Sequence, residues 1–468
     1  MIFNPKNTVI TDECFVFSGD VCAVANACID TDIIKEFWHN FTFTCSSLSV
    51  TAADEYVFCV GNAAKLPLDG NEYSINVTND GICVYAKDKE SLLHGFMTLI
   101  DRFKAKDGDT GLCVTVGGCQ IKDKPIISNR MIHFCIFPET ELWELKRFVR
   151  LCGALRYTHI VLEFWGMLKY DCMAELAWPH AYTKDEVRPI VDEARALGME
   201  VIPMFNHWGH ASACRVIHGK HVVLDQNPAL QTYFSEDGWC WDISQPKVRR
   251  LLSQVRRELI ELCGDGGYFH IGCDEAYNFE FTNENMDALC KFINEVCDDM
   301  RALGRRIFIW GDMLLYRYAH YNPKNKYTCN APSPEVEKYF LDRLDKDIII
   351  ADWQYHRCYA PIETCRVFTG GGFECILCPW DEAKEHTDAT LETIKSESLF
   401  GFMHTTWHTL SLGMPYVTYM GVGGFEDISD YHRSAARTHT ATLLRKVMPI
   451  NGDYEKAGWS KFETSCRW

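Results

Sequence analysis

Short apolar runs alternate with helical patterns through the part of the chain that follows residue 125. Eight runs are rich in apolar and β-branched residues, as buried strands are: Arg130 to Cys135, His159 to Phe164, Glu200 to Phe205, Tyr268 to Gly272, Arg306 to Trp310, Asp347 to Trp353, Phe373 to Cys378 and Phe400 to Thr405. Helical spacing of apolar residues separates several of them, in Leu142 to Leu155, Lys184 to Leu197, Val248 to Cys263 and Met286 to Leu303. These repeated units predict a (β/α)8 TIM barrel, whose usual size is about 250 residues.

A doubly wound open sheet is the alternative α/β architecture. Glycine-rich phosphate-binding patterns do not follow any of the predicted strands, which disfavours a nucleotide-binding version of that fold. The barrel is therefore the favoured prediction.

The chain before residue 125 has a different pattern. Strand-like runs at residues 56–60, 73–77 and 81–86 are followed by an amphipathic helix at about 91–103 and a further strand near 112–116. Asp123-Lys124-Pro125 then reads as a turn or linker. We expect a small α+β domain over residues 1–124, the barrel over 125–450, and a tail over 451–468 packed on the barrel.

The length of the chain supports two domains, and its net charge limits the classes of partner that it can bind. The chain has 468 residues, more than a single core usually supports, and 47% of them are hydrophobic. A formal net charge of −17 argues against nucleic acid or an anionic membrane as partner, because either would favour a basic face. The start Met1-Ile2-Phe3-Asn4 lacks a signal-peptide pattern, and no apolar run reaches transmembrane length, so we expect a cytoplasmic protein.

The 23 cysteines are scattered through predicted strands and helices. Free buried thiols in a reducing compartment account for this pattern more simply than a disulfide framework does. Cys375 and Cys378 form one Cys-x-x-Cys inside an apolar run, which we interpret as core packing because a single pair is weak evidence for zinc.

Two adjacent carboxylates follow the fourth predicted barrel strand. Asp274 and Glu275 come directly after His270-Ile271-Gly272-Cys273. Consecutive side chains of a strand point to opposite faces, so both acids reach one site only if the strand has ended, and Gly272 allows that break. Capping of the next helix is the alternative role for such a pair. In a barrel, however, catalytic residues gather at these strand ends.

Aromatic residues also gather where the predicted strands end. Five of the thirteen tryptophans do so, namely Trp165, Trp310, Trp353, Trp380 and Trp407. Together they predict an aromatic-walled pocket of the kind that grips sugar rings or small acyl groups.

These motifs resemble glycoside hydrolase family 20, the β-N-acetylhexosaminidases. The resemblance rests on Arg130 after Ile126-Ile127-Ser128-Asn129, Ile202-Pro203 leading to Gly209-His210, His270-x-Gly272-x-Asp274-Glu275, Trp310-x-Asp312, and Trp407. Leu162-Glu163-Phe164 and Asp352-Trp353-Gln354-Tyr355-His356 are closest to the hexosaminidase D-like, intracellular-type branch. The resemblance to family 20 covers nearly the whole chain, since the family also carries a small α+β domain before its barrel.

The resemblance implies an exo-acting enzyme that releases terminal β-linked GlcNAc or GalNAc with retained configuration and without metal or cofactor. The substrate's own acetamide would be the nucleophile, an exception to the two-carboxylate scheme. Glu275 would be the acid and base, and Asp274 would orient the acetamide. The implied substrate-binding residues are Arg130, Glu163, His210, Trp310, Asp312, Trp353, Tyr355, Asp381 and Trp407.

Several roles have alternatives. Arg130 could pair with Glu163 across neighbouring strands instead of binding sugar, and His210 and Asp312 could support the site without touching substrate. The family's usual His-x-His-x-x-Asp and Tyr-Leu-Asp patterns are replaced here by residues 161–166 and by Pro379-Trp380-Asp381. The choice between gluco and galacto substrates therefore stays open.

Two other functions are compatible with the same residues. A metal-dependent barrel hydrolase would use His207, His210 and either Asp274 or His270 as ligands. A sugar-binding protein without turnover is the non-enzymatic alternative, which the presence of both Asp274 and Glu275 disfavours. The expected partner is a carbohydrate substrate, an N-acetylhexosaminide. A homodimer is one option for assembly.

Overall fold

The computed structural model describes residues 2–109, 111–212, 223–317, 327–380, 384–407, 410–428 and 433–449. Eight parallel strands close into a barrel in the order β10-β11-β12-β13-β14-β15-β16-β9. The strands are β9 (Asn129–Cys135), β10 (His159–Glu163), β11 (Glu200–Met204), β12 (Tyr268–His270), β13 (Arg306–Trp310), β14 (Ile349–Asp352), β15 (Glu374–Leu377) and β16 (Gly401–Thr406). The predicted TIM barrel is confirmed, with strand ends within a few residues of those expected.

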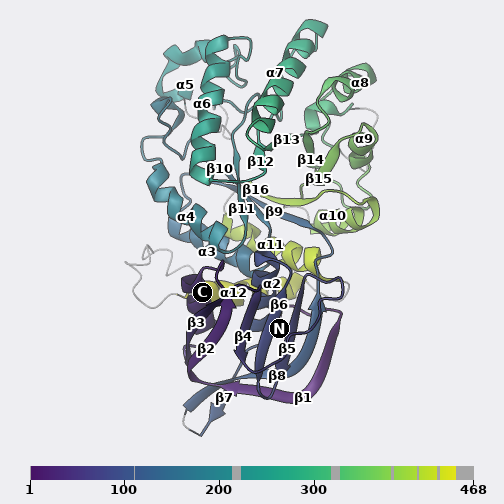
Figure 1. Ribbon diagram of the computed structural model, residues 1–468. Coiled ribbons are helices and arrows are strands. Elements are labelled where there is room, and N and C mark those ends of the chain that lie inside the picture. Colours follow the sequence, from purple (N-terminus) through teal and green to yellow (C-terminus); the bar gives the residue numbers. More distant parts are fainter. Residues whose placement is uncertain are drawn as a thin grey trace.

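Helices surround the barrel (Figure 1). They are α3 (Leu142–Ala154), α4 (Lys184–Ala196), α5 (Val223–Gln226), α6 (Pro246–Cys263), α7 (Asn283–Arg301), α8 (Pro334–Arg343), α9 (Thr364–Gly370), α10 (Lys384–Glu397), α11 (Leu410–Phe425) and α12 (Arg433–Val447). Local sequence fixes several starts: Thr183 and Glu186 form a capping box on α4, and Thr282 caps α7. Each of these two helices buries one apolar face.

The N-terminal part forms a mixed sheet in the order β1-β8-β5-β6-β4-β2-β3, with β7 paired to β8. Its strands are β1 (Thr8–Phe17), β2 (Gly19–Asn26), β3 (Ser46–Ala53), β4 (Val57–Gly61), β5 (Tyr73–Thr78), β6 (Gly81–Ala86), β7 (Lys104–Gly108) and β8 (Gly111–Asp123), and its helices are α1 (Thr31–Phe41) and α2 (Lys89–Ile100). The sequence pattern missed β1 to β3, in which many positions are exposed. It identified β4, β5, β6, α2 and the first part of β8, but not α1 or β7.

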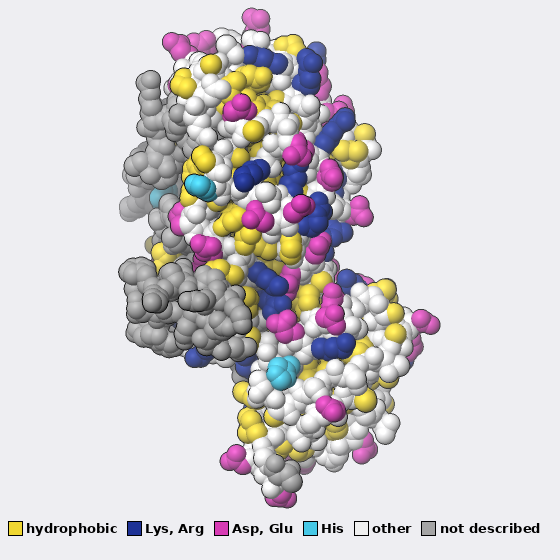
Figure 2. Space-filling view, turned by 90° about the vertical axis from the view of Figure 1, so that its left-hand side faces the viewer, with side chains coloured by type: hydrophobic (Ala, Val, Ile, Leu, Met, Phe, Trp, Pro, Cys, Tyr) yellow, Lys and Arg dark blue, Asp and Glu magenta, His cyan; other side chains and the backbone are white. Residues whose placement is uncertain are grey.

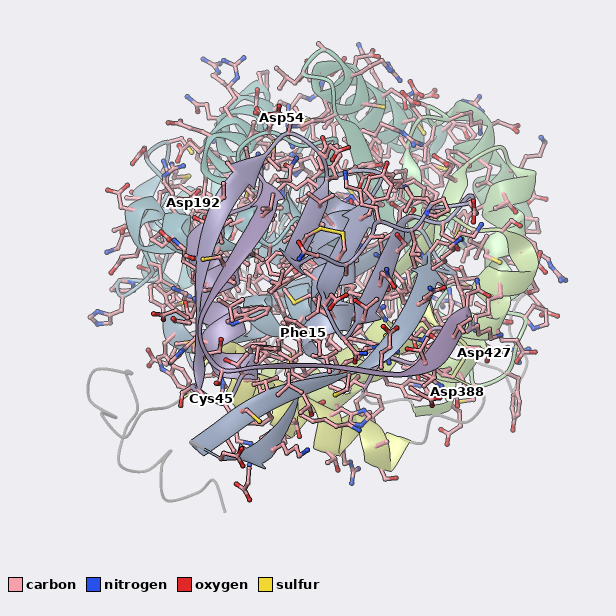
Figure 3. All side chains as sticks on the ribbon, turned by 60° about the horizontal axis from the view of Figure 1, so that its bottom comes forward. Phe15, Cys45, Asp54, Asp192, Asp388 and Asp427 are labelled. Carbon is pink, nitrogen blue, oxygen red and sulfur yellow. A yellow bond between two sulfur atoms is a disulfide. The ribbon has the colours of Figure 1, made fainter. Side chains whose placement is uncertain are left out.

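The sheet lies at the end of the barrel where its strands begin, as Figures 1 and 3 show. In Figure 3, Phe15, Cys45 and Asp54 mark the sheet, which faces the viewer with the barrel behind it. Strand β8 ends at Asp123 and β9 begins at Asn129, so a short connection joins the two parts. The expected boundary at residue 124/125 stays a prediction, and the expected tail over 451–468 lies outside the described residues.

Inward-facing residues recur at every second position of the barrel strands, as the strand period requires. A buried apolar cluster fills the barrel with Met131, Val161, Ile202, Met204, Phe308, Trp310, Ile349, Ala351, Ile376, Cys378 and Met403. The next inward positions toward the strand ends carry polar and aromatic side chains. The site described below is therefore built directly on this packed layer.

Charges of both signs are interspersed on the face shown in Figure 2. No helix among the described residues is both long and apolar enough to cross a bilayer. Cys59 and Cys83 face each other on β4 and β6 and form a disulfide, so the expectation of uniformly free thiols is wrong for this pair. The other cysteines of the described residues form no disulfide.

Arg156 joins the sheet to the barrel. Its side chain is fully buried, with one nitrogen 2.9 Å from Glu426 Oε1 and another 3.2 Å from Thr98 Oγ1. The guanidinium lies between the rings of Phe3 and Phe425, 3.8 and 3.6 Å from their centroids. Because Glu426 is also buried, removing the cation would leave a carboxylate without its countercharge.

We expect Arg156→Met to lower the free energy of unfolding by about 3–5 kcal/mol, the usual effect of breaking a buried ion pair. Urea unfolding measures it. Lys338→Ala, which removes an exposed pair with Asp342, is the control and should cost less than about 1 kcal/mol. A loss for Arg156→Met no larger than that control would contradict the role of this arginine.

Candidate active site

The backbone leaves the strand geometry immediately after β12. Gly272, Cys273 and Glu275 have φ values of 67°, 77° and 51°, in the left-handed region. A Cβ atom on Gly272 would lie 2.0 Å from Asn206 Oδ1, so only glycine fits there. Strained backbone of this kind is frequent at functional sites. It lets Asp274 and Glu275 share one site despite their adjacency in sequence.

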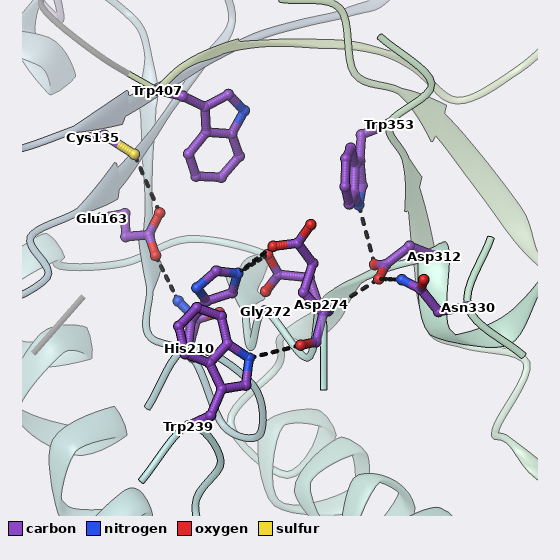
Figure 4. A network of polar contacts seen from close by, with 12 residues as sticks. Cys135, Glu163, His210, Trp239, Gly272, Asp274, Asp312, Asn330, Trp353 and Trp407 are labelled. Atoms are coloured by element: carbon purple, nitrogen blue, oxygen red, sulfur yellow. Dashed lines mark hydrogen bonds and ion pairs between the residues drawn. The ribbon is translucent and has the colours of Figure 1, made fainter. Parts of the chain in front are cut away.

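His210 contacts both carboxylates (Figure 4). Its Nε2 lies 2.9 Å from Glu275 Oε2 and 3.4 Å from Asp274 Oδ2. The loop that carries it passes very close to Asp274, since a Cβ on Gly209 would lie 1.8 Å from the Asp274 carbonyl oxygen. Gly209 is therefore required for His210 to reach the acids.

Asp312 anchors the backbone of Glu275 from the neighbouring strand. Its Oδ2 accepts hydrogen bonds from the Glu275 N–H at 3.0 Å and from Asn330 Nδ2 at 2.8 Å, and its Oδ1 accepts one from Trp353 Nε1 at 3.1 Å. Burial, together with the charges of Asp274 and Glu275, raises the pKa of Asp312 to about 8. Asp312 therefore holds a proton over much of the neutral range.

Four aromatic residues surround the carboxylates from the later strands. Trp407 Nε1 donates to the Tyr355 hydroxyl at 2.6 Å, and Trp310 lies 5.7 Å from Trp407 between ring centroids. Trp353 and Tyr355 are 5.1 Å apart. In Figure 4, the indoles of Trp353 and Trp407 lie on opposite sides of the carboxylates. The structure thus brings the four predicted aromatic residues together.

Glu163 lies at the end of β10 in a buried polar group. One of its oxygens is 3.0 Å from His133 Nε2 and 3.4 Å from Cys135 Sγ, and the other accepts a hydrogen bond from Asn206 Nδ2 at 2.6 Å. Sequence reasoning missed these three partners. A period-two count along β9 from the inward-facing Met131 would have placed His133 and Cys135 inside the barrel.

The predicted sugar contact of Arg130 is wrong. Arg130 is the second residue of β9, at the opposite end of the strand from the site, and its side chain is fully buried. Its nitrogens donate to the carbonyls of Ile127, Ser128 and Arg156 at 2.8–2.9 Å. Because Met131 faces the barrel interior, Arg130 faces outward, which also excludes the alternative pairing with Glu163.

The ligand set of the metal-hydrolase alternative is not assembled. His207 Nδ1 lies 2.6 Å from the Phe205 carbonyl and its Nε2 lies 3.0 Å from Arg256 Nη1, so a cation competes for the second nitrogen. Among the described residues, two other groups bring three ligand atoms within 4.8 Å, namely His210, Asp274 and Glu275, and His133, Cys135 and Glu163. Asp381, a predicted substrate contact, lies outside the described residues.

Two loop residues beside the acids were also missed. Trp239 Nε1 donates to the Glu275 carbonyl at 2.7 Å, and its ring packs 4.4 Å from His210. Tyr277 stacks on Trp239. No strand pattern points to them, because both lie on connections whose path depends on the fold.

This arrangement suits acid–base chemistry on a ring-shaped substrate. Glu275 is partly exposed and hydrogen-bonded to an imidazole, whereas Asp274 is almost fully buried beside it. Two carboxyl groups in different environments can divide the roles of proton donor and charge stabiliser. The surrounding rings would exclude water from one face of the reacting group.

Comparisons with known proteins agree with this geometry. Residues 162–382 match the family described as "Glycosyl hydrolase family 20, catalytic domain". A β-hexosaminidase of Porphyromonas gingivalis is 25% identical over 241 residues, which are 46% of this chain and 30% of the relative. A lacto-N-biosidase of Bifidobacterium bifidum is 24% identical over 62% of this chain and 24% of its own length. The chain thus spans less than a third of either relative.

A solved structure shares the fold over nearly the whole chain. It is the family 20 exo-β-N-acetylglucosaminidase from Vibrio harveyi in complex with N-acetylglucosamine, with a TM-score of 0.66 at 15% identity. The match covers 98% of this chain and 78% of that one. Both the barrel and the sheet that precedes it in the chain therefore have counterparts in a known structure.

We expect Asp312→Asn to change how stability depends on pH. The unfolded carboxyl ionises near its ordinary pKa of 3.8 and the folded one near 8, so the folded state binds more protons in between and wild-type stability falls as pH rises through that window. Asparagine cannot ionise. The free energy of unfolding of the variant, relative to that of wild type, should therefore rise between pH 4 and 8, by at most about 1.4 kcal/mol per pH unit.

Urea unfolding at several pH values measures this difference. Asp12→Asn, at an exposed position, is the matched control and should shift little with pH relative to wild type. If the difference between Asp312→Asn and wild type is constant from pH 4 to 8, the raised pKa is refuted.

Proposed function

Because the chain belongs to glycosyl hydrolase family 20, we propose that it is an exo-acting β-N-acetylhexosaminidase. Its substrates would carry a terminal β-linked GlcNAc or GalNAc. The observation that carries the proposal is the Asp274–Glu275 pair held by His210 between the aromatic side chains of β13 to β16. The named activities of the relatives point to the same chemistry.

In the first step, the carbonyl oxygen of the substrate's 2-acetamido group attacks C1 of the same sugar. The bond from C1 to the leaving oxygen breaks while Glu275 donates its proton to that oxygen. The product is a cyclic oxazolinium ion, whose positive charge is shared with the acetamide nitrogen. Asp274 accepts a hydrogen bond from that N–H and stabilises the charge.

In the second step, Glu275 is a carboxylate and takes a proton from water. The water attacks C1 and reopens the ring, which restores the acetamide and returns the proton to Glu275. Two inversions at C1 give net retention. His210, with one nitrogen near both acids, would hold Glu275 in position for both proton transfers.

The aromatic residues would enclose the acetamide methyl group. Trp353 and Trp407 lie on either side of the carboxylates in Figure 4, and Trp310 packs against Trp407. The Tyr355 hydroxyl, which bonds Trp407 and lies 3.1 Å from Thr405 Oγ1, would turn toward the acetamide oxygen. Enclosure matters because it keeps out water molecules other than the one that Glu275 activates. Glu163 would accept hydrogen bonds from sugar hydroxyls on the far side of the ring.

The expected homodimer and cytoplasmic location remain proposals of the same kind. Exposed Val9, Ile10 and Val16 on β1 support contact with a second copy, since apolar side chains on an edge strand favour pairing. The many free cysteines support a reducing compartment.

We expect Glu275→Gln to slow hydrolysis of N,N′-diacetylchitobiose by about 10²–10⁴-fold, the usual contribution of a general acid. Release of nitrophenol from the aryl β-N-acetylglucosaminide should fall much less in the first step, because that leaving group needs little protonation. Steady-state kcat/KM values of both substrates, which report the first step, measure this. Glu284→Gln on α7 is the matched control and should keep wild-type rates. Equal losses on both substrates would remove Glu275 from the acid role.

Asp274→Asn should slow both substrates, by about 10²-fold or more, because attack by the acetamide on C1 accompanies departure of either leaving group. Pre-steady-state and steady-state rates on the same pair of substrates provide the measurement. An Asp274→Asn enzyme that keeps wild-type turnover would show that the acetamide is oriented by another group.

Dialysis against a chelator should leave turnover unchanged, since the acetamide, Glu275 and Asp274 account for every bond made and broken. Metal analysis of the dialysed protein by mass spectrometry is run beside the assay. Loss of activity that returns with added zinc would favour a metal-dependent hydrolase instead.

A further inference from the structure

Two buried side chains with metal-binding atoms, His133 and Cys135, take no part in the mechanism above. Both are fully buried, and Glu163 beside them is only 2% exposed. His133 and Cys135 follow the inward-facing Met131 at every second position of β9, so they also face the barrel interior. Cys135 is paired in register with Glu163 of β10. An imidazole, a thiol and a carboxyl group therefore meet where two neighbouring strands end.

The three ligand atoms are spaced like three corners of a tetrahedron around zinc. His133 Nε2 lies 3.0 Å from Glu163 Oε2, and Cys135 Sγ lies 3.4 Å from that oxygen and 3.7 Å from His133 Nε2. With zinc bonds of about 2.0–2.3 Å at tetrahedral angles, two ligand atoms are about 3.4–3.6 Å apart. Adjustments of about 0.4 Å or less would let all three atoms bind one ion.

Neighbouring hydrogen bonds hold these ligands in place. The second oxygen of Glu163 accepts a hydrogen bond from Asn206 Nδ2 at 2.6 Å, and the backbone N–H of Cys135 donates to Thr406 Oγ1 at 3.3 Å. Supporting contacts of this kind orient the ligands of metal sites. One sulfur, one nitrogen and one oxygen suit zinc, whereas magnesium and calcium prefer oxygen ligands alone.

The group lies against the side chains that would enclose the acetamide. The His133 ring is 4.7 Å from the ring of Trp407 and 6.0 Å from that of Trp310, between centroids. A cation bound here would take Glu163 Oε2 away from the sugar hydroxyls. It would also place positive charge near a positively charged intermediate. Both effects oppose turnover.

We propose that His133, Cys135 and Glu163 bind a zinc ion and that the bound ion blocks hydrolysis. The Cys135 S–H bond breaks as the Zn–S bond forms, its proton leaves to water, and a water molecule takes the fourth position. The metal site goes beyond the proposed hexosaminidase function, whereas the block rests on it. Because zinc must displace a proton and the hydrogen bonds within the group, the Kd is on the order of micromolar. An assay without added zinc therefore leaves the site metal-free.

The binding test starts from protein dialysed against a chelator and then freed of it. Zinc is titrated in competition with a chromophoric indicator, and Co²⁺ is added in parallel because a sulfur-to-cobalt charge-transfer band reports a thiolate ligand. The wild type should show one site and the band. Cys135→Ser and His133→Gln should raise the Kd at least about 100-fold, since loss of a supporting group alone costs about 10–100-fold. Cys135→Ser should also lose the band.

Cys378→Ser is the matched control, because Cys378 is likewise buried inside the barrel but lies outside the group. It should keep the wild-type Kd and the cobalt band. Mg²⁺ should not compete with zinc in any of the proteins. A wild type that lacks the site overturns the proposal, as does a Cys135→Ser protein that binds zinc as tightly as wild type.

Rates of nitrophenol release from the aryl β-N-acetylglucosaminide test the block. With zinc at about ten times the Kd, wild-type kcat/KM should fall about tenfold and return when chelator is added. Cys135→Ser and His133→Gln, each compared with its own zinc-free rate, should lose less than about twofold at the same zinc concentration. Equally strong inhibition of Cys135→Ser would place the ion on His210, Asp274 and Glu275 and overturn the proposal. Zinc that binds the wild type without slowing it also overturns the block.

Failure of the hexosaminidase function itself gives a different result. If the zinc-free wild type releases no nitrophenol, the indicator titration still decides the metal site. Calorimetric titration with N-acetylglucosamine, with and without zinc, then decides the block. A sugar Kd that rises about tenfold in zinc supports competition at the site while the hydrolase is refuted. An equal Kd with and without zinc, or no sugar binding at all, refutes the block as well.

Discussion

The hydrogen bond from the Glu275 N–H to the Asp312 carboxyl fixes the geometry on which the rest of the site depends. Two adjacent residues can serve one reaction only if the chain stops alternating between faces, and here it does so through left-handed backbone at three of four positions. Such backbone persists when its surroundings over-determine it. Asp312, which follows β13, holds this backbone in place. It also accepts a hydrogen bond from Trp353, so Glu275 and one aromatic side chain share a single anchor.

Burying the Asp312 carboxyl beside two other carboxyl groups has an electrostatic cost. Three carboxyl groups lie close together with one imidazole among them, and the burial of Asp312 favours its neutral form. A neutral Asp312 can be buried beside two potential anions without adding a third negative charge. The same group can therefore hold the loop and leave Asp274 and Glu275 to divide the remaining charge between them.

The sequence predicted the barrel and the acid pair because both depend on local pattern. Apolar runs of strand length, followed by Asp, Glu and Trp, reveal the strands and the strand ends that carry these side chains without knowledge of packing. Arg130 was misplaced because a motif match ignores which face a strand residue occupies, whereas Met131 in the barrel core settles it. Trp239, Tyr277 and Asn330 could not be found from pattern, because their contacts with the acids depend on the paths of long loops. The exposed strands β1 to β3 carry too weak an apolar pattern to be recognised.

The sheet of the N-terminal part lies at the end of the barrel where the strands begin (Figure 1). Asp274 and Glu275 follow β12 and therefore lie at the opposite end. Arg156 of the barrel binds Thr98 of α2 and packs on the ring of Phe3, so the sheet and the barrel should behave as one body under load. The protein can consequently be attached to a bead or a surface through the sheet without obstructing the face that carries Asp274 and Glu275. Immobilisation through that end would orient each molecule with its site toward the solution, which makes the fold convenient for a flow reactor or an affinity resin.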